Sequence, residues 1–241
     1  MAVTTVYQSS QGRVGNSASG TLAAAWASAK GTNTTTGNSV GSTSTNDNFG
    51  SRTQAARGGQ FLATNYRAYF YFDLSSISDI TGITFTARGG TNSTNQNGDW
   101  IAARANQDAD FGTIATSDYT LVYNSTTGFT SYSQNVASWS YNADNTVTLN
   151  PTAVSNSNNE GELCVCLMNY TYDYDGGEVE GSIGDIFNSL SFINSGTTRA
   201  RLTVTHTVAS GYDNEVNAII PASISKVLGI ATADISKVTG V

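Results

Sequence analysis

The sequence predicts an all-β protein: an antiparallel jelly-roll sandwich over residues 1–210, followed by a short apolar tail over residues 211–241. Three observations lead to this prediction. Several segments alternate apolar and polar residues with the two-residue period of a strand. Loops rich in Gly, Asn, Ser and Thr separate these segments, and no convincing amphipathic helix precedes residue 211. Short strands between turn clusters are typical of antiparallel sandwiches.

Four segments carry the strand pattern. Residues 67–74, 83–88 and 201–208 each place apolar side chains on one face, as half-buried strands do. Residues 162–172 are apolar on both faces, which suits a central strand between two layers. We expect loops at 31–50, 89–98, 124–128 and 155–161. The side chains expected to face the core are Ala68, Phe70, Phe72, Leu74, Ile83, Phe85, Ala87, Leu202, Val204, His206 and Val208, with Arg67, Tyr69, Tyr71 and Asp73 on the opposite face of the first segment.

The composition excludes two classes of partner. Only 12% of the residues are charged, the net charge is −7 and the pI is about 4.5. Nucleic acid is therefore not expected as a ligand, because phosphate binding needs clustered Lys and Arg. No apolar run approaches the roughly 18 residues of a membrane span, so no membrane partner is expected. The two cysteines, Cys164 and Cys166, are predicted to be small buried hydrophobes rather than a disulfide or a metal site.

The tail contains an internal repeat. The hexapeptide Ile224-Ser-Lys-Val-Leu-Gly229 returns as Ile235-Ser-Lys-Val-Thr-Gly240, with an offset of 11 residues. Its apolar residues follow the spacing of one helix face, and Pro221 suits a first helical turn. The alternative is two short extended pieces broken at Gly229, which the β-branched residues favour. The predicted interface residues are Ile224, Val227, Leu228, Ala231, Ile235 and Val238.

Exposing the apolar side chains of the tail to water is unfavourable. We expect the tail to dock on another subunit, either a second copy of the chain or a larger particle. Two alternatives stay open at this point: the tail folds back on its own sandwich, or it is a disordered end.

An acidic cluster is the candidate metal site. Asp173, Asp175, Glu178 and Glu180 could supply hard oxygen ligands for calcium, although their spacing is not that of an EF-hand loop. The alternative is a solvated loop whose carboxylates repel one another. Calcium is the only cofactor that the sequence suggests.

Aromatic side chains form the candidate ligand site. Tyr170, Tyr172 and Tyr174 would share one face of a strand and could stack on the sugar rings of a glycan, as could Trp100. Cross-strand packing is the alternative for the same residues.

No catalytic group is predicted. His206 is the only histidine and lies on the apolar side of the last strand, where a structural role is expected. The sequence contains neither a Gly-x-Ser-x-Gly elbow nor a phosphate-binding Gly-x-x-x-x-Gly-Lys motif. A carboxylate pair for glycoside hydrolysis stays open, because the sequence does not tell which acidic residues approach each other. We expect a protein that is not an enzyme.

The stretch from Arg67 to Ile77, Arg-Ala-Tyr-Phe-Tyr-Phe-Asp-Leu-Ser-Ser-Ile, is followed by Ile83-Thr-Phe85. It resembles a group of jelly-roll modules that are related to carbohydrate-binding modules and recur in bacteriophage virion proteins. Those modules carry Arg-x-x-x-x-Phe-Asp-x-Ser-x-Ile and then a strand beginning with Ile. The Ile-Ser-Lys-Val-x-Gly repeat separately resembles C-terminal segments of phage structural proteins.

The resemblance implies a virion component, such as a head fibre, a decoration protein or a tail-associated protein. Its partners would be other virion subunits or further copies of itself, for example in a trimer. The first alternative is a carbohydrate-binding module that attaches to glycans of a host surface. The second is a subunit of an extracellular filament or surface layer, which would place the protein outside the cell rather than in a virion.

Overall fold

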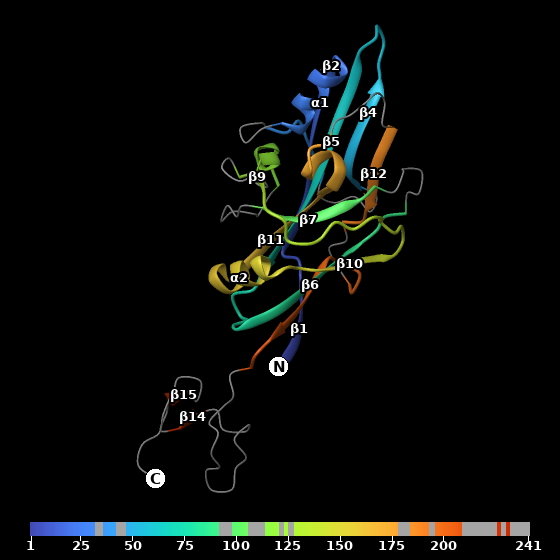
Figure 1. The fold of residues 1–241 in the computed structure, drawn as a ribbon. Helices are drawn as coiled ribbons and strands as arrows, with labels where there is room; N and C mark the ends of the chain where they lie inside the picture. The colour runs from blue at the N-terminus through green and yellow to red at the C-terminus, as the bar shows by residue number, and fades with distance from the viewer. Residues whose placement is uncertain are drawn as a thin grey trace.

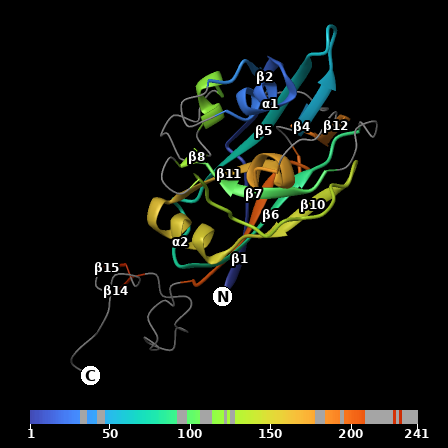
Figure 2. The same ribbon diagram turned by 45° about the horizontal axis from the view of Figure 1, so that its top comes forward.

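A computed structural model provides the structure of the chain. It describes residues 1–31, 36–41, 47–91, 98–105, 114–120, 123–124, 128–177, 184–192, 196–208, 226–227 and 230–231. The predicted fold class is confirmed: antiparallel sheets pack face to face, and helices are few (Figures 1 and 2).

The first sheet has four antiparallel strands in the order β1-β13-β6-β10. Strands β1 and β13, the first and the last of this sheet along the chain, pair antiparallel from Ala2 opposite His206 to Tyr7 opposite Arg201. Both predicted strands at 83–88 and 201–208 belong to this sheet. The bounds are β1 Ala2–Tyr7, β6 Ile80–Arg88, β10 Asp144–Thr148 and β13 Arg201–His206.

The second sheet is built around the 13-residue strand β5. Strand β2 pairs along one edge of β5, and β3 pairs with β2. On the other edge, β4 pairs with Phe61–Tyr66 and β11 with Ala68–Asp73. Strand β12 then extends from β4, and β7 extends from β11. The bounds are β2 Ser10–Gly20, β3 Ser39–Gly41, β4 Asp47–Ala55, β5 Phe61–Asp73, β7 Trp100–Arg104, β11 Glu162–Asn169 and β12 Gly184–Leu190.

A tight hairpin joins β4 to β5. The Ala56 amide donates to the Gln60 carbonyl over 2.7 Å. Gly58 and Gly59 have φ of 78° and 74°, values that glycine adopts without steric cost. This hairpin tip and the N-terminus lie at opposite ends of the sandwich in both ribbon views (Figures 1 and 2).

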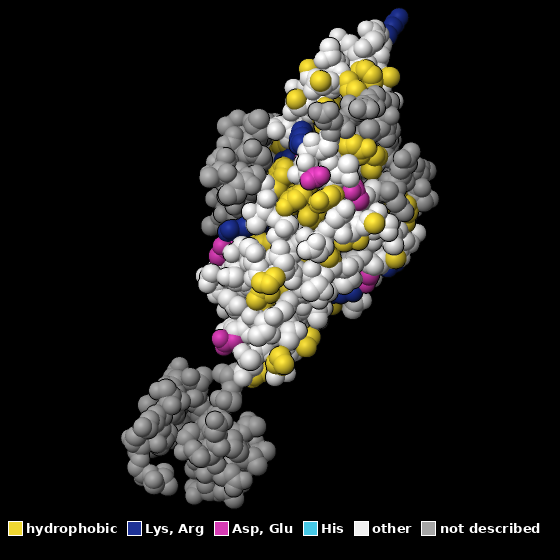
Figure 3. All heavy atoms as spheres, viewed as in Figure 1, with side chains coloured by type: hydrophobic (Ala, Val, Ile, Leu, Met, Phe, Trp, Pro, Cys, Tyr) yellow, Lys and Arg dark blue, Asp and Glu magenta, His cyan; other side chains and the backbone are white. Residues whose placement is uncertain are grey.

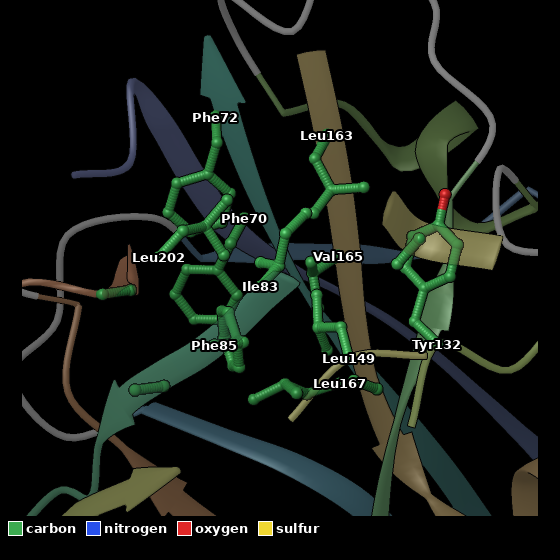
Figure 4. Close-up of a cluster of buried hydrophobic side chains, with 14 of the residues drawn as sticks. Phe70, Phe72, Ile83, Phe85, Tyr132, Leu149, Leu163, Val165, Leu167 and Leu202 are labelled. Atoms are coloured by element: carbon green, nitrogen blue, oxygen red, sulfur yellow. The ribbon is translucent and has the colours of Figure 1, made fainter. Parts of the chain in front are cut away.

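The main core fills the space between the two sheets (Figure 4). Phe70 and Phe72 of β5 meet Phe85 of β6 at ring distances of 5.5 and 6.1 Å. Nine of the residues expected to face the core do so: Ala68, Phe70, Phe72, Leu74, Ile83, Phe85, Ala87, Leu202 and Val204.

The prediction was wrong for the last two residues of that set. His206 is half-buried, and its Nε2 lies 3.0 Å from the Thr4 hydroxyl. Val208 is 62% exposed. The reason is that β13 changes register between Thr205 and His206 and ends there, so the alternation no longer aims side chains at the core.

The outer face of the second sheet is also covered, so the expectation that β5 is half-buried was wrong over Arg67 and Tyr69. Both residues are buried, with exposures of 2% and 0%. The covering elements are the helix α1 (Leu22–Lys30), the turns η1 (Thr116–Thr120) and η2 (Tyr170–Tyr174), and the short pair β8 (Tyr123–Asn124) and β9 (Gly128–Phe129). The predicted central strand at 162–172 is confirmed over β11, which is almost fully buried but ends at Asn169.

Two helices were missed by the sequence analysis. Helix α1 begins after Thr21, whose hydroxyl accepts from the Ala24 amide. Helix α2 (Pro151–Glu160) replaces the loop expected at 155–161. The Asn150 side chain caps its first turn, and Gly161 closes it with φ of 68°. Neither helix buries a broad stripe of large apolar residues, so periodicity could not reveal them.

The tail contains two short strands, β14 (Lys226–Val227) and β15 (Ile230–Ala231), which pair with each other. The helical expectation was therefore wrong at these four residues, and the extended alternative holds there. Of the predicted interface residues, Ile224, Leu228, Ile235 and Val238 lie outside the described residues. Among the described residues no helix has the length and hydropathy that spanning a membrane requires.

Candidate functional site

A buried ion pair joins β5 to η2. The guanidinium of Arg67 donates from Nε to Asp173 Oδ2 over 2.8 Å and from Nη2 to Oδ1 over 2.7 Å. The two side chains are 3% and 0% exposed. Such two-pronged pairing matches the planar fork of arginine to the carboxylate and fixes the relative orientation of both groups.

The remaining donors of Arg67 bind the elements that cover β5. Nη1 donates to the Tyr119 carbonyl over 2.8 Å, and Nη2 also donates to the Lys30 carbonyl over 3.2 Å. The Tyr119 hydroxyl donates to the Ala29 carbonyl over 2.6 Å and accepts from the Asn65 amide over 3.0 Å. One arginine thereby connects β5 with η1, η2 and the end of α1.

The acidic cluster predicted for calcium does not form around Asp173. Both of its oxygens face the guanidinium of Arg67 inside the protein, so a cation beside them would be repelled. Asp175 is exposed, and Glu178 and Glu180 lie outside the described residues. Asp173 as a calcium ligand is therefore a wrong prediction: the carboxylate serves the fold.

Planar groups stack above the ion pair. The Arg67 guanidinium lies 4.2 Å from the centre of the Tyr119 ring and 5.2 Å from that of Phe129. Phe129 stacks on Tyr174, and Tyr174 on Tyr170, with ring centres 5.7 Å apart in both pairs. The rings of Phe129, Tyr170 and Tyr174 are half-buried. We call these three rings the aromatic stack.

The three predicted tyrosines do not share one face. Residues 170–174 form a π-helical turn, which the Asn169 side chain caps by accepting from the Tyr172 amide over 2.7 Å. The turn brings Tyr170 and Tyr174 together and directs Tyr172 elsewhere. Tyr172 meets Trp26 of α1 edge-on, with ring centres 6.3 Å apart.

Trp100 cannot present its ring to a ligand. It is 1% exposed, its indole N–H donates to the Ser138 carbonyl over 3.1 Å, and its ring meets Trp139 edge-on at 5.2 Å. A glycan role for Trp100 was therefore a wrong prediction. Hydrophilic neighbours in the sequence, Asn97-Gly-Asp-Trp, suggested exposure, whereas β7 turns the indole into the core.

Burial keeps several ionisable groups of this region in their neutral form. It raises the pKa of the Tyr69 and Tyr119 hydroxyls and of the Cys164 and Cys166 thiols, because removal from water disfavours the charged form of each group. The two thiols are free and buried, as predicted. No group of three potential metal ligands occurs in the described ranges.

A second region lies at the end of the sandwich where both chain ends emerge. Because Ala2 and Ile80 both lie opposite His206, the start of β1, the start of β6 and the end of β13 meet there. We call this end, formed by residues 1–3, 79–82 and 206–208, the terminal pole. Met1, Val3 and Val208 are 94%, 65% and 62% exposed; the one other exposed large apolar residue among the described residues is Val40, at 40%.

Two grooves open at the terminal pole, and Asn158 of α2 lines both of them. The Asn158 side chain accepts from the Ile80 amide over 2.8 Å and donates to the Ile80 carbonyl over 2.9 Å, which fixes α2 to β6. The first groove has a volume of about 670 Å³, and its lining includes Ser75, Ile77, Ser78, Asp79, Thr81 and Thr207. The second has about 470 Å³, and its lining includes Gly82, Thr148, Leu149, Pro151, Val154 and Ser155.

Sequence reasoning found neither the buried role of Arg67 nor these grooves. The only sequence signal for the ion pair is an arginine in an aromatic strand together with a distant acidic segment. On the face that Figure 3 shows, the described surface is largely uncharged, with isolated acidic and basic side chains.

No protein-family model and no curated protein matches this chain.

Replacing one member of the buried pair should destabilise the fold strongly. We expect Asp173→Asn to lower the free energy of unfolding by about 3–5 kcal/mol, since Arg67 is left as an uncompensated buried charge. The double variant Arg67→Met/Asp173→Leu should lose less than the single variant. Urea unfolding followed by tryptophan fluorescence measures both.

Asp144→Asn is the matched control for that substitution. Asp144 pairs with Arg201 over 2.7 Å, but its side chain is 36% exposed, so the loss should be at most about 1 kcal/mol. An equal loss in Asp173→Asn and Asp144→Asn would contradict the structural importance of the buried pair.

Alkaline pH should destabilise the protein. The unfolded chain releases tyrosine protons near pH 10, whereas Tyr69 and Tyr119 hold theirs to higher pH in the folded state, and burial raises the pKa of Tyr132 to about 12. The free energy of unfolding should be unaffected by these groups below about pH 9 and should fall as the pH rises above about 10. Urea midpoints and phenolate absorbance measured against pH check this. Complete ionisation of all tyrosines before unfolding would contradict it.

Proposed function

We propose that this chain is a non-enzymatic structural component of a bacteriophage virion, such as a head fibre, decoration or tail-associated protein. The sandwich is displayed outward, and the C-terminal segment attaches it to other subunits. The observation that carries the proposal is the arrangement of the tail: β14 and β15 pair with each other and belong to neither sheet of the sandwich. They follow a terminal pole that already carries exposed apolar side chains.

The construction of the sandwich supports a display role. Its second sheet has packed side chains on both faces, and the four hydrogen bonds of Arg67 fix the outer layer without a disulfide. The most strongly perturbed ionisable groups are buried in that layer and serve packing. Groups placed in this way stabilise a scaffold rather than react with a substrate.

The proposed attachment works by apolar burial. Each large apolar side chain of the repeat that leaves water contributes about 1.5–3 kcal/mol as an upper estimate. Several copies of a weak anchor held in one assembly bind more strongly together than singly. Self-association, for example as a trimer, and insertion among other virion subunits both use this property.

Charging the apolar repeat should abolish assembly. In Ile224→Asp/Ile235→Asp, both repeats lose the same apolar position to a carboxylate that must stay in water. We expect native mass spectrometry to show assemblies of the parent chain and a monomer for this variant.

The matched control for the repeat variant is Ser225→Asp/Ser236→Asp, which adds the same charge at the neighbouring polar position of each repeat and should keep the parent's assembly state. A monomeric parent chain would refute self-association through the tail. An Ile224→Asp/Ile235→Asp variant that assembles like the parent would refute attachment through the tail.

Glycan binding is a second candidate function, favoured by the aromatic stack. Tyr174 contacts both neighbouring rings, so Tyr170 ends the stack and is the ring that could pack on a sugar. On a glycan array, Tyr170→Ala should reduce binding about tenfold, equivalent to about 1.4 kcal/mol. Tyr172→Ala, whose ring packs on Trp26, should keep it. An array without signal for the parent chain excludes this function under the conditions used.

A further inference from the structure

We infer that the two grooves of the terminal pole receive the C-terminal segment, residues 209–241, of a second copy of this chain. The inference rests on the proposed attachment through the tail and adds the surface that receives it. The first groove begins where the segment begins: the Thr207 amide donates to the Asp79 carbonyl over 3.1 Å, and both residues line the groove.

The grooves and the repeat have complementary chemistry. The walls combine apolar side chains, such as Ile77, Leu149 and Val154, with hydroxyl and amide groups. Each repeat likewise combines Ile and Val with a Ser and a Lys. A segment of this composition could bury its apolar side chains and still satisfy its polar groups there.

Charge strengthens the match. Asp79 is the only charged residue among the described residues that line either groove. Each repeat carries one lysine, Lys226 or Lys237, directly between Ser and Val. A lysine ammonium beside Asp79 would gain an opposite charge at the rim of the groove.

A second copy, rather than the same chain, is the occupant that follows from the proposed attachment to other subunits. The two described strands of the segment, β14 and β15, pair with each other and join neither sheet of the sandwich. Exchange between copies is reciprocal, because every copy donates one segment and receives another. A closed symmetric assembly then satisfies all grooves at once.

Cross-linking distinguishes the two occupants. Thr81 lines both grooves and is exposed, and Ser223 immediately precedes the first repeat. A mixture of the full-length single variants Thr81→Cys and Ser223→Cys should give a disulfide-linked heterodimer on mild oxidation. Cys164 and Cys166 are buried and should not compete. Thr197→Cys, beyond the other end of β13, is the control position and should not cross-link to Ser223→Cys.

Two results would overturn the inference. One is a disulfide that forms within the chain of a Thr81→Cys/Ser223→Cys double variant but not between the single variants, which would show a tail folded on its own sandwich. The other is no cross-link in either format, which would place the tail on a different surface.

Removing the groove charge is an independent test. Asp79 has φ of 54°, a conformation that asparagine also tolerates, so Asp79→Asn removes the charge and should leave the backbone unchanged. We expect it to raise the dissociation constant of the assembly by up to about fivefold, a loss that salt should reproduce in the parent chain. No change in that constant would count against the groove.

The outcomes separate the inference from the proposed function. Suppose that Ile224→Asp/Ile235→Asp abolishes assembly, that Asp79→Asn leaves the dissociation constant unchanged and that Thr81→Cys forms no cross-link. The tail is then the anchor, and the groove is not its receptor. If the repeat variant assembles normally, attachment through the tail itself fails.

Discussion

The outer layer of this protein depends on one buried ion pair. Arg67 projects from the long strand β5 and holds Asp173, the Tyr119 carbonyl and the Lys30 carbonyl at the same time. These partners are distant in sequence, and each belongs to a different covering segment. A buried charge is tolerated only when it is paired and hydrogen-bonded, so the three segments must take up their positions together. The need to satisfy every donor of Arg67 therefore determines how the covering segments, the third layer of the fold, lie on the second sheet.

That third layer explains the composition of β5. In a sandwich strand with one solvent-exposed face, the polar residues of the alternating pattern are exposed. In β5, Arg67 and Tyr69 lie on the face opposite the core and are nevertheless buried. Aromatic rings with a polar tip suit a covered face that still holds carbonyl groups, because the ring packs and the hydroxyl binds. Tyr69 follows this pattern and donates to the Tyr119 carbonyl over 3.2 Å. Polar groups thereby define the layer's geometry, and the rings fill its volume.

The sequence pattern predicted the strands that have one face toward the core. Phe85 and Leu202 lie where alternation placed them, because a two-residue period determines which side chains share a face. The same pattern could not reveal what covers the other face, since the covering segments come from distant parts of the chain. For this reason Arg67 was expected outside, Asp173 was expected to bind calcium, and the π-helical turn around Tyr172 was expected to be a strand. The sequence signal for helix α2 is its cap, Asn150 followed by Pro151, rather than a periodic pattern of apolar residues.

The arrangement of the two ends of the sandwich has a practical consequence. The hairpin between β4 and β5 turns at Gly58 and Gly59, and no atom lies within 4 Å of where a side chain would begin at either glycine. This tip lies opposite the end at which the chain enters and leaves (Figures 1 and 2). A foreign epitope spliced between these glycines would sit at the far end of a disulfide-free β-ribbon, opposite the N-terminus and the end of β13. An inserted epitope and an attachment at the N-terminus would therefore lie at opposite ends of the sandwich.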